Sequence, residues 1–524
     1  GAKLGANIIY DLEWLLHEGY DVNMKTLHDV QYAEPLLNEY RRSYSLASLA
    51  KIHTQEQKRT DVLENYNDQM GWKGKAISNL WKMPSNVVEE YVLADITLPL
   101  DIFSAQKKQL EHEGLYDLYV METELIPSLL RMRKNGVKID KKRFKNVVQR
   151  FSEQHYTLGK TLKKWASSDI NLNSSAQLAK VFDSYGIPYP RRAPTAKMKE
   201  AGKQGNPKLD KAALSKLVAE YPICKTILEY RHVDTMVNMF LHPYLDFMVD
   251  GRLFGTFHPL KSDEYGTVAG RFSASKPNLQ QVSAIDEDSD DGGLQGQVLR
   301  ELFIPEEDMD WAKSDYSQIE YRIMAHYAEG PSAEALRAKY NTDPKTDMHK
   351  IIMNDTGFDR RTSKRLNFGG AYGMGVPTAS ETFGWSMEEA DIFMASYHKA
   401  APYVKELRNK VSSSAARRGF IYTVLGRKAR THYSRKLHSF FNRLMQGSAA
   451  DVMKKAIVDA EKKGLFDELV LHLTVHDELD VSVPRNKAGK EALTELNHTM
   501  EHAVKFDVPL LVECHTGSNW AEAD

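Results

Sequence analysis

The sequence predicts a multidomain α+β protein, and three observations lead to this fold class. Its 524 residues, 42% of them hydrophobic and 27% charged, are enough for three or four domains rather than one core. Residues 113–250 have a helical pattern. From 251 to the end, short segments typical of strands alternate with long helical patterns, and a helical insert spans about 318–418.

The first 112 residues have an α/β pattern instead. The apolar segment 7–16 (NIIYDLEWLL) is expected to form a strand, and the segment 86–103 (NVVEEYVLADITLPLDIF) a helix. We therefore expect a separate N-terminal domain that differs in architecture from the helical region after it.

Composition excludes several classes of protein. No apolar run approaches the ~18 residues of a membrane-spanning helix, and the N-terminus lacks a basic segment followed by an apolar one. The two cysteines, Cys224 and Cys514, are far apart in sequence and offer neither a disulfide framework nor zinc-ligand spacing. These features favour a cytoplasmic protein without a membrane anchor.

The net charge of −1 hides two strongly basic stretches. Residues 131–164 contain twelve Lys or Arg residues against two acidic ones, and residues 191–216 contain eight against two. Each stretch can be the solvated face of a helix, but two of them together suit a surface that follows the phosphates of a nucleic acid.

Two aspartates stand at positions where a scaffold can hold them rigidly. In 472–484 (HLTVHDELDVSVP), apolar residues alternate on both sides of a His-Asp-Glu triplet, which predicts a strand, a tight turn with Asp477 at its tip, and a second strand. In 310–328 (DWAKSDYSQIEYRIMAHYA), a short strand ends at Asp315 and a helix follows. Taken alone, Asp315 is a helix cap and Asp477 a turn residue.

Together, Asp315 and Asp477 suggest a different role. If they meet on one sheet, they can hold two divalent cations ~3.5–4 Å apart, the arrangement that stabilises both oxygens of a phosphoryl displacement. Mg²⁺ suits such a site, because it takes few carboxylates and completes its shell with water and substrate phosphates.

A third motif combines cations, aromatic rings and glycines. Arg360, Lys364, Phe368 and Tyr372 recur every fourth residue in 359–375 (DRRTSKRLNFGGAYGMG), so a helix would carry them on one face. The motif is either a surface helix with a half-buried aromatic edge or a site that binds phosphate at one end and a base or sugar at the other. Its four glycines favour the close approach of another group to the backbone.

These three motifs resemble motifs A, B and C of family A DNA polymerases, in that order and at familiar spacing. They are DYSQIEYR (315–322), RRTSKRLNFGGAYG (360–373) and VHDEL (475–479). Further similar segments are AGRFSASKPNLQQV (269–282), NRLMQGSAAD (442–451) and GSNW (517–520). The details have a bacteriophage-like character, and the resemblance covers nearly the whole chain.

The resemblance implies a right-hand polymerase fold with an antiparallel-sheet palm, helical fingers and a helical thumb. The implied divisions are a partial 3′-5′ exonuclease-like domain (1–112), a linker helix and thumb (113–255), the first part of the palm (256–330), the fingers (331–418) and the second part of the palm (419–524). It also implies an incomplete α/β, RNase H-like N-terminal domain.

The resemblance further implies residue roles at the centre of the site. Asp315 and Asp477 would bind two Mg²⁺ ions, which Mn²⁺ can replace, with the carbonyl of Tyr316 as a further ligand. Glu478 would be a secondary acidic group. Lys364 would protonate the leaving pyrophosphate.

The incoming deoxynucleotide would meet a set of side chains from motifs A and B and the segment between them. Glu320, held by Tyr372, would exclude a ribose 2′-hydroxyl, and Phe368 would disfavour dideoxynucleotides. The implied nucleotide-binding residues are Arg360, Lys364, Phe368, Tyr372, His349, Glu320 and Gln318.

A further set would touch the primer terminus and the minor groove. The implied DNA-binding residues are Arg271, Asn278, Gln280, Asn442, Gln446 and His476. Departures from the family pattern at Ala269, Tyr321 and Arg443-Leu444 affect the fine placement of these contacts.

The N-terminal region resembles part of a proofreading exonuclease. Asn7 and Asp11 match its second motif, and Tyr91 and Asp95 match its third, whereas the first motif, Asp-x-Glu, would lie upstream of Asp11. Because a two-metal nuclease needs all its carboxylates, we expect this chain not to proofread, and excision of a mismatched primer end would refute that expectation.

The sequence thus predicts a DNA-directed DNA polymerase, a nucleotidyltransferase of phage or bacterial genome replication. Its expected partners are primer-template DNA and deoxynucleoside triphosphates, with the chain acting as a monomer, in the host cytoplasm if it is phage-encoded. A processivity factor is left open. The alternatives are a single-subunit RNA polymerase and a catalytically inactive nucleic-acid-binding relative.

Overall fold

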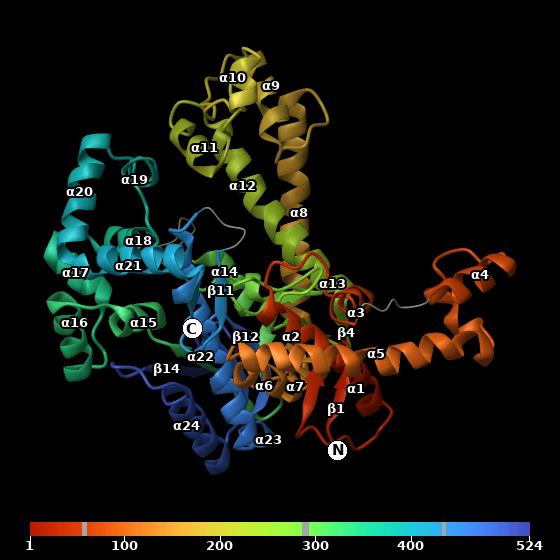
Figure 1. Ribbon diagram of the computed structural model, residues 1–524. Helices are drawn as coiled ribbons and strands as arrows, with labels where there is room; N and C mark the ends of the chain where they lie inside the picture. Colours follow the sequence, from red (N-terminus) through yellow and green to blue (C-terminus); the bar gives the residue numbers. More distant parts are fainter. Residues whose placement is uncertain (55–59, 286–292, 432–435) are drawn as a thin grey trace.

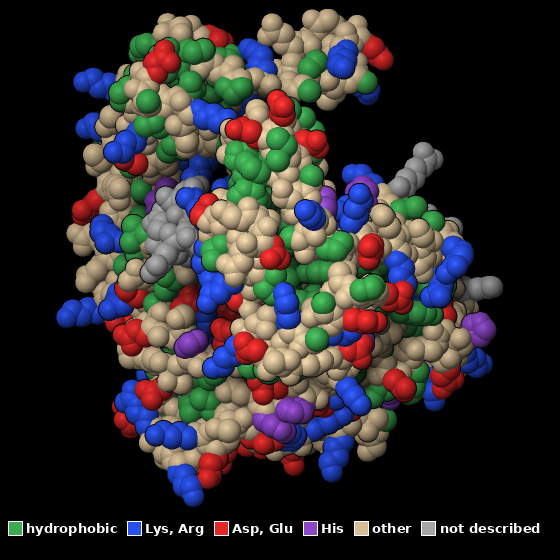
Figure 2. Space-filling model, turned by 90° about the vertical axis from the view of Figure 1, so that its left-hand side faces the viewer, with side chains coloured by type: hydrophobic (Ala, Val, Ile, Leu, Met, Phe, Trp, Pro, Cys, Tyr) green, Lys and Arg blue, Asp and Glu red, His purple; other side chains and the backbone are tan. Residues whose placement is uncertain are grey.

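The computed structural model describes residues 1–54, 60–285, 293–431 and 436–524. Within these ranges, no helix is both long and apolar enough to cross a membrane. Acidic and basic side chains are interspersed over the face shown in Figure 2, in line with the small net charge.

The N-terminal region packs helices around a two-stranded parallel sheet, and its long helix α5 extends away from the body (Figure 1). Its elements are β1 (Lys3–Gly5), α1 (Ile8–His17), β2 (Leu27–Asp29), α2 (Val30–Leu37), α3 (Leu46–His53), α4 (Asp61–Gln69), η1 (Ala76–Lys82) and α5 (Ser85–His112). The strand expected at 7–16 is wrong, because this segment forms α1. Ile8, Ile9 and Leu12 are its buried residues, a helical spacing that a short apolar run does not distinguish from a strand.

The next region is mainly helical, as the sequence indicates, and two of its helices project from the body (Figure 1). Its elements are α6 (Tyr116–Glu124), α7 (Ile126–Asn135), β3 (Val137–Ile139), α8 (Lys141–Ala166), α9 (Ser175–Tyr185), α10 (Ala196–Glu200), α11 (Lys211–Leu217), α12 (Ile223–Thr235), η2 (Met236–Leu241), α13 (His242–Phe247) and β4 (Met248–Val249). Helices α8 and α12 pair, and α9 to α11 lie at their far end. The sequence missed β3, whose three residues are too short to show a period.

The basic stretch 131–164 is partly neutralised by contacts with the body. Arg131 forms ion pairs with Glu461 at 3.0 Å and Asp467 at 2.7 Å, and Arg143 contacts Glu301 at 3.0 Å. Part of this charge therefore joins regions of the chain to each other.

A four-stranded antiparallel sheet with strand order β12-β13-β9-β14 forms the centre of the body. These strands are β9 (Met309–Tyr316), β12 (Val470–Val475), β13 (Glu478–Pro484) and β14 (Val512–Gly517). A second sheet, of order β4-β5-β3-β8, and a small pair lie nearby. Their remaining elements are β5 (Arg252–Leu253), β6 (Thr256–His258), β7 (Ser273–Ser275), η3 (Leu279–Gln281), α14 (Leu294–Arg300) and β8 (Phe303–Ile304).

Seven helices follow β9 and form the lobe on the left of Figure 1. They are α15 (Ile319–Tyr327), α16 (Pro331–Thr342), α17 (Met348–Thr356), α18 (Arg360–Ala371), α19 (Val376–Phe383), α20 (Met387–Ala400) and α21 (Pro402–Arg418). The carboxylate of Asp359 accepts a hydrogen bond from the backbone N–H of Thr362 at 3.0 Å, which fixes the start of α18.

The chain then returns to the body through a hairpin and a long buried helix. These elements are β10 (Phe420–Tyr422), β11 (Lys428–Arg430), α22 (Ser439–Lys462), α23 (Leu465–Glu468) and, after β13, α24 (Lys487–Glu501). Most of α22 is buried, and it contacts α15, α21 and α24. It therefore connects the helical lobe to the central sheet.

Candidate active site

Two neighbouring segments of the central sheet bring Asp315 and Asp477 together. Strands β12 and β13 are joined by a two-residue turn of His476 and Asp477, in which His476 has a φ of 59°. Strand β9 pairs with β13 in the register that sets Asp315 opposite Glu478. The backbone N–H of Tyr316 donates to the carbonyl of Asp477 at 3.1 Å, so the two aspartates meet as the sequence predicts.

The electrostatics of this pair favour a bound cation. Burial, followed by the negative charges of Asp477 and Glu478, raises the pKa of Asp315 to about 8. Burial also raises the pKa of Asp477 to about 6. The Oδ1 atom of Asp315 is buried and has no hydrogen-bond partner in the described part of the chain. An unpaired oxygen between repelling carboxylates fits a divalent metal ligand.

No closed metal cage surrounds the pair. The described residues include no group of three or more His, Cys, Asp or Glu side chains that could hold an ion. An open site with few protein ligands is what Mg²⁺ takes when substrate phosphates and water complete its coordination.

Glu478 has a different environment from the one expected of a secondary acid at the metal site. Its buried carboxylate accepts hydrogen bonds from the Trp520 indole at 2.7 Å and from Arg300 at 3.2 Å. Arg300 is 1% exposed. Glu478 therefore forms a buried ion pair beside the aspartates, although its charge still acts on Asp315.

A cleft of about 700 Å³ lies over the two aspartates. The predicted site residues that line it are Arg271, Asp315, Tyr316, Gln318, Glu320, His349, Arg360, Phe368, Tyr372, Gln446, His476 and Asp477. The predicted residues that do not line it are Lys364, Glu478, Asn278, Gln280 and Asn442.

The cleft also contains residues that sequence reasoning missed. They are Ser317, Ile319, Tyr321, Lys345, Asp347, Lys350 and Glu513. Glu513 lies on β14 directly opposite Asp315, a register that no local pattern encodes. The two lysines flank residues 347–349. Their positive charge beside His349, a predicted nucleotide-binding residue, was the available signal that they belong to the site.

Glu320 is held from two sides at the cleft wall. Its carboxylate accepts a hydrogen bond from Arg271 at 2.7 Å and another from the Tyr372 hydroxyl. The Tyr372 ring also lies 6.3 Å from the Phe441 ring of α22. The predicted Glu320–Tyr372 contact is therefore present, and it joins α15 to the end of α18.

The opposite wall carries the cationic residues. Arg360 donates to Asp347 at 3.1 Å. Burial, together with the nearby charges of Lys364 and Arg360, lowers the pKa of His349, although Asp347 opposes this shift. The side chain of Gln318 accepts from the backbone N–H of Met348 at 3.0 Å. These contacts bring the starts of α15, α17 and α18 together.

The aromatic end of α18 packs against side chains of neighbouring helices. Phe368 is 44% exposed, and its ring lies 5.6 Å from His349 and 6.0 Å from Tyr321. A Cβ atom on Gly370 would come within 2.3 Å of the Tyr397 ring. The glycines predict that another group approaches the backbone closely. At Gly370 this group is the ring of Tyr397.

Two of the remaining predicted DNA contacts, Asn278 and Gln280, have structural partners. Asn278 caps η3, and the Gln280 side chain donates to the carbonyl of Thr474 at 3.0 Å. Burial, with the charge of Arg271 adding, lowers the pKa of His476.

Two residues of the predicted exonuclease remnant lie near each other. Asp11 on α1 and Asp95 on α5 are close enough to interact, since burial first and then Asp95 raise the pKa of Asp11. Tyr91 lies one turn before Asp95 on α5, and Asn7 precedes α1 with a φ of 63°.

Comparisons with known proteins agree with the resemblance found in the sequence. The pattern of DNA polymerase family A matches residues 141–522. A DNA-directed DNA polymerase of Pseudomonas phage M6 is 28% identical over 586 aligned residues, which cover 100% of this chain and 83% of the relative. DNA polymerase DpoZ of Salmonella phage PMBT28 is 26% identical, and the alignment covers 99% of this chain and 88% of the relative.

Bacterial relatives extend the comparison. DNA polymerase I of Geobacillus stearothermophilus is 29% identical over 94% of this chain, but only 55% of the relative is covered. A solved structure described as the POL domain of Pol1 from M. smegmatis in complex with DNA primer-template and dNTP superimposes with a TM-score of 0.82. It is 24% identical and covers 100% of this chain and 86% of that one, which supports the right-hand polymerase fold. With most of its length matched by the family pattern, the chain belongs to DNA polymerase family A.

Proposed function

We propose that this DNA-directed DNA polymerase adds deoxynucleotides to a primer 3′-hydroxyl at the cleft over Asp315 and Asp477. One observation carries the proposal: the carboxylates of Asp315 at the end of β9 and of Asp477 in the β12–β13 turn converge in one cleft with Arg360, His349 and Phe368. In the reaction, the primer 3′-oxygen bonds to the α-phosphorus of the nucleotide, and the bond to pyrophosphate breaks.

Family A polymerases use divalent metal ions in general. In this chain Asp315, Asp477 and the Tyr316 carbonyl would hold two Mg²⁺ ions, which would supply positive charge at the attacking and leaving oxygens. The raised pKa values of Asp315 and Asp477 support this assignment, because each carboxylate gains from a nearby cation. Mn²⁺, which also accepts oxygen ligands, is the proposed substitute.

The fingers-side residues would bind the triphosphate. Arg360 and His349 line the cleft, and the charge of Lys364 acts on His349. We assign the triphosphate to these three side chains and the proton for the leaving pyrophosphate oxygen to the Nζ of Lys364. Gln318 contributes by fixing the start of α17, next to His349.

Selectivity for the sugar would come from Glu320. Its two hydrogen bonds hold the carboxylate against the cleft, where it would exclude a 2′-hydroxyl. Phe368, exposed beside it, would pack on the sugar and disfavour dideoxynucleotides.

The primer-template would lie across the palm. Arg271, Gln446 and His476 line the cleft, and we assign the primer terminus and minor groove to them together with Asn442, Asn278 and Gln280. The chain is proposed to act as a monomer. The five divisions expected from the sequence serve as the proposed domains.

Primer extension tests this function directly. A labelled primer on a template of known sequence is incubated with the protein, Mg²⁺ and single nucleotides, either deoxy or ribo. We expect addition only of the complementary deoxynucleotide. Efficient addition of ribonucleotides instead would favour an RNA polymerase, and no addition of either would refute the proposal.

A further inference from the structure

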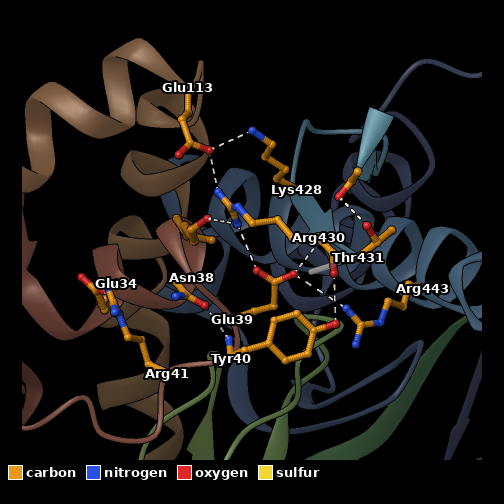
Figure 3. Close-up of polar contacts among 12 residues, drawn as sticks. Glu34, Asn38, Glu39, Tyr40, Arg41, Glu113, Lys428, Arg430, Thr431 and Arg443 are labelled. Carbon is orange, nitrogen blue, oxygen red and sulfur yellow. Dashed lines mark hydrogen bonds and ion pairs between the residues drawn. The ribbon is translucent and has the colours of Figure 1, made fainter. Parts of the chain in front are cut away.

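Glu39 and Tyr40 of the N-terminal region lie against the β10–β11 hairpin and α22 (Figure 3). Glu39, 4% exposed, is the centre of this junction. Its carboxylate accepts from the backbone N–H of Arg430 at 2.6 Å and from the Arg430 guanidinium at 3.0 Å, and it lies 3.7 Å from the Arg443 guanidinium. One buried carboxylate thus serves two arginines from separate elements.

Arg430 is held by several N-terminal groups besides Glu39. Its guanidinium donates to the carbonyl of Leu36 at 3.0 Å and to Glu113 at 2.6 Å. The Tyr40 hydroxyl donates to the carbonyl of Arg430 at 3.1 Å (Figure 3). The end of β11 is therefore fixed to the N-terminal region by side-chain and backbone contacts together.

Arg443 extends the junction into α22. Its guanidinium lies 5.1 Å from the centre of the Tyr40 ring and 5.2 Å from that of Phe440, distances at which a cation is attracted to an aromatic face. Arg443 is the residue after Asn442 and precedes Gln446 by one helical turn. The contacts of Arg443 therefore hold the first turns of α22, which also carry the proposed DNA contacts Asn442 and Gln446.

The inner side of the hairpin is also fixed by ion pairs. Arg427 bonds to Glu122 and lies 2.7 Å from Asp451, and Lys454 bonds to Glu122 at 2.7 Å. All four groups are buried. Because interior packing leaves little room for independent movement, a shift of the hairpin is transmitted to α22.

From α22 the contacts continue to the cleft. The Phe441 ring of α22 lies 6.3 Å from the Tyr372 ring, and the Tyr372 hydroxyl donates to Glu320. A continuous set of packed and hydrogen-bonded groups thus joins Glu39 in the N-terminal region to the nucleotide-binding wall.

We propose that Glu39 is a positioning residue of the polymerase site, through which the N-terminal region sets the placement of α22 and hence the binding of the primer terminus. This inference rests on the proposed function. It gives the N-terminal region a role in DNA synthesis that does not depend on nuclease activity. Without the Glu39 charge, two half-buried arginines lose their shared counter-ion, and the start of α22 is no longer held in one position.

The test compares Glu39→Gln with two other variants in steady-state primer extension. The amide keeps the acceptor for the Arg430 N–H but removes the charge. We expect the KM for primer-template to rise about 3- to 10-fold, a typical range for coupling through contacts remote from the ligand. The kcat at saturating DNA and the KM for the nucleotide should change less than about 2-fold.

Matched variants separate positioning from general damage. Glu13→Gln breaks the Glu13–Arg133 ion pair of 2.8 Å, which joins the N-terminal region to α7 rather than to the first turns of α22, and it should leave all three parameters unchanged. Tyr40→Phe removes the hydroxyl that donates to the carbonyl of Arg430 but keeps the ring beside Arg443, and it should raise the KM for primer-template less than Glu39→Gln does.

Three results would contradict either the inference or the proposed function. An unchanged KM for primer-template in Glu39→Gln overturns the inference. If kcat and thermal stability fall together while this KM stays the same, Glu39 has a purely structural role and the inference is also overturned. Failure of the unaltered protein to extend any primer would instead refute the proposed function.

Discussion

Among single residues, Asp315 has an unfavourable environment in the absence of a cation. A buried carboxylate beside two others loses solvation without gaining a partner, and the pKa of about 8 expresses that cost. Such groups gather at functional sites, where a ligand offsets the penalty. The environment of Asp315 therefore favours binding of a cation rather than stability of the fold.

The Glu320 carboxylate gives a prediction at the same scale. Replacing Glu320→Ala removes the group that Arg271 and Tyr372 hold in place, so space for a 2′-hydroxyl opens. We expect ribonucleotide incorporation relative to deoxynucleotide incorporation to rise about 10- to 100-fold, measured as the ratio of the two kcat/KM values. Glu334→Ala, at an exposed carboxylate of α16, is the control and should leave the ratio unchanged.

The sequence indicated most of the site because its residue types have strong local patterns. Asp477 at a hairpin tip and Asp315 at a strand end followed from alternation and turn chemistry. Glu513 did not, because it joins the cleft through the register of β14 against β9. The partners of Glu478 also could not be foreseen, since Trp520 and Arg300 are distant in sequence.

At the scale of elements, the motif-B helix α18 depends on one close contact. Gly370 faces the Tyr397 ring of α20, whose hydroxyl donates to the carbonyl of Asn367 at 3.4 Å. The neighbouring Gly369 faces the Met374 side chain, whose flexible end is nearest. Two adjacent glycines of one helix therefore differ in what an added methyl group would meet.

This contrast predicts opposite effects of the same substitution. Gly370→Ala should lower the free energy of unfolding by about 1–3 kcal/mol, because the packed ring must move. Gly369→Ala should be neutral or stabilising by up to about 1 kcal/mol, because alanine favours a helix and the methionine can move aside. Urea unfolding of both variants measures the difference, and equal effects would contradict the contact assigned to Tyr397.

Prediction of elements succeeded where the pattern was long or clearly periodic. The strands around Asp477 and the helix over 86–103 agree with β12, β13 and α5. Segment 7–16 was assigned to the wrong class because a continuous apolar run is compatible with both periods. Strand β3 has three residues and owes its conformation to β5 and β8 rather than to its own sequence.

At the scale of the whole molecule, buried polar groups join regions that are distant in sequence. The Nδ1 atom of His472 on β12 donates to the carbonyl of Gly136 at 2.9 Å, and its Nε2 lies 2.6 Å from the Ser482 hydroxyl. Burial lowers the pKa of His472 to about 4. The helical region before β3 is thus attached to the palm through a neutral histidine.

This histidine predicts an acid-sensitive fold. The unfolded chain binds the proton with a pKa near 6.5, so protonation favours unfolding as the pH falls from about 6.5 toward 4. Between pH 7.5 and pH 5, we expect His472 to account for a loss of about 2 kcal/mol in the free energy of unfolding.

The comparison variant is His472→Gln, studied by urea unfolding at both pH values. Its loss of stability on acidification should be smaller than that of the unaltered chain. His258, whose pKa burial also lowers to about 4, remains in both proteins and cancels in the difference. An identical pH dependence would show that His472 does not link the two regions in this way.

The central claim is that Asp315 and Asp477 form the metal-dependent site of DNA synthesis. The most direct measurement is single-turnover primer extension in Mg²⁺ by Asp477→Asn, with primer-template binding measured in parallel. Asp310→Asn, which removes an exposed carboxylate from the same strand as Asp315, is the control. We predict a loss of more than about 100-fold in the extension rate for Asp477→Asn, with binding retained and the control active. Unaltered extension by Asp477→Asn would contradict the account.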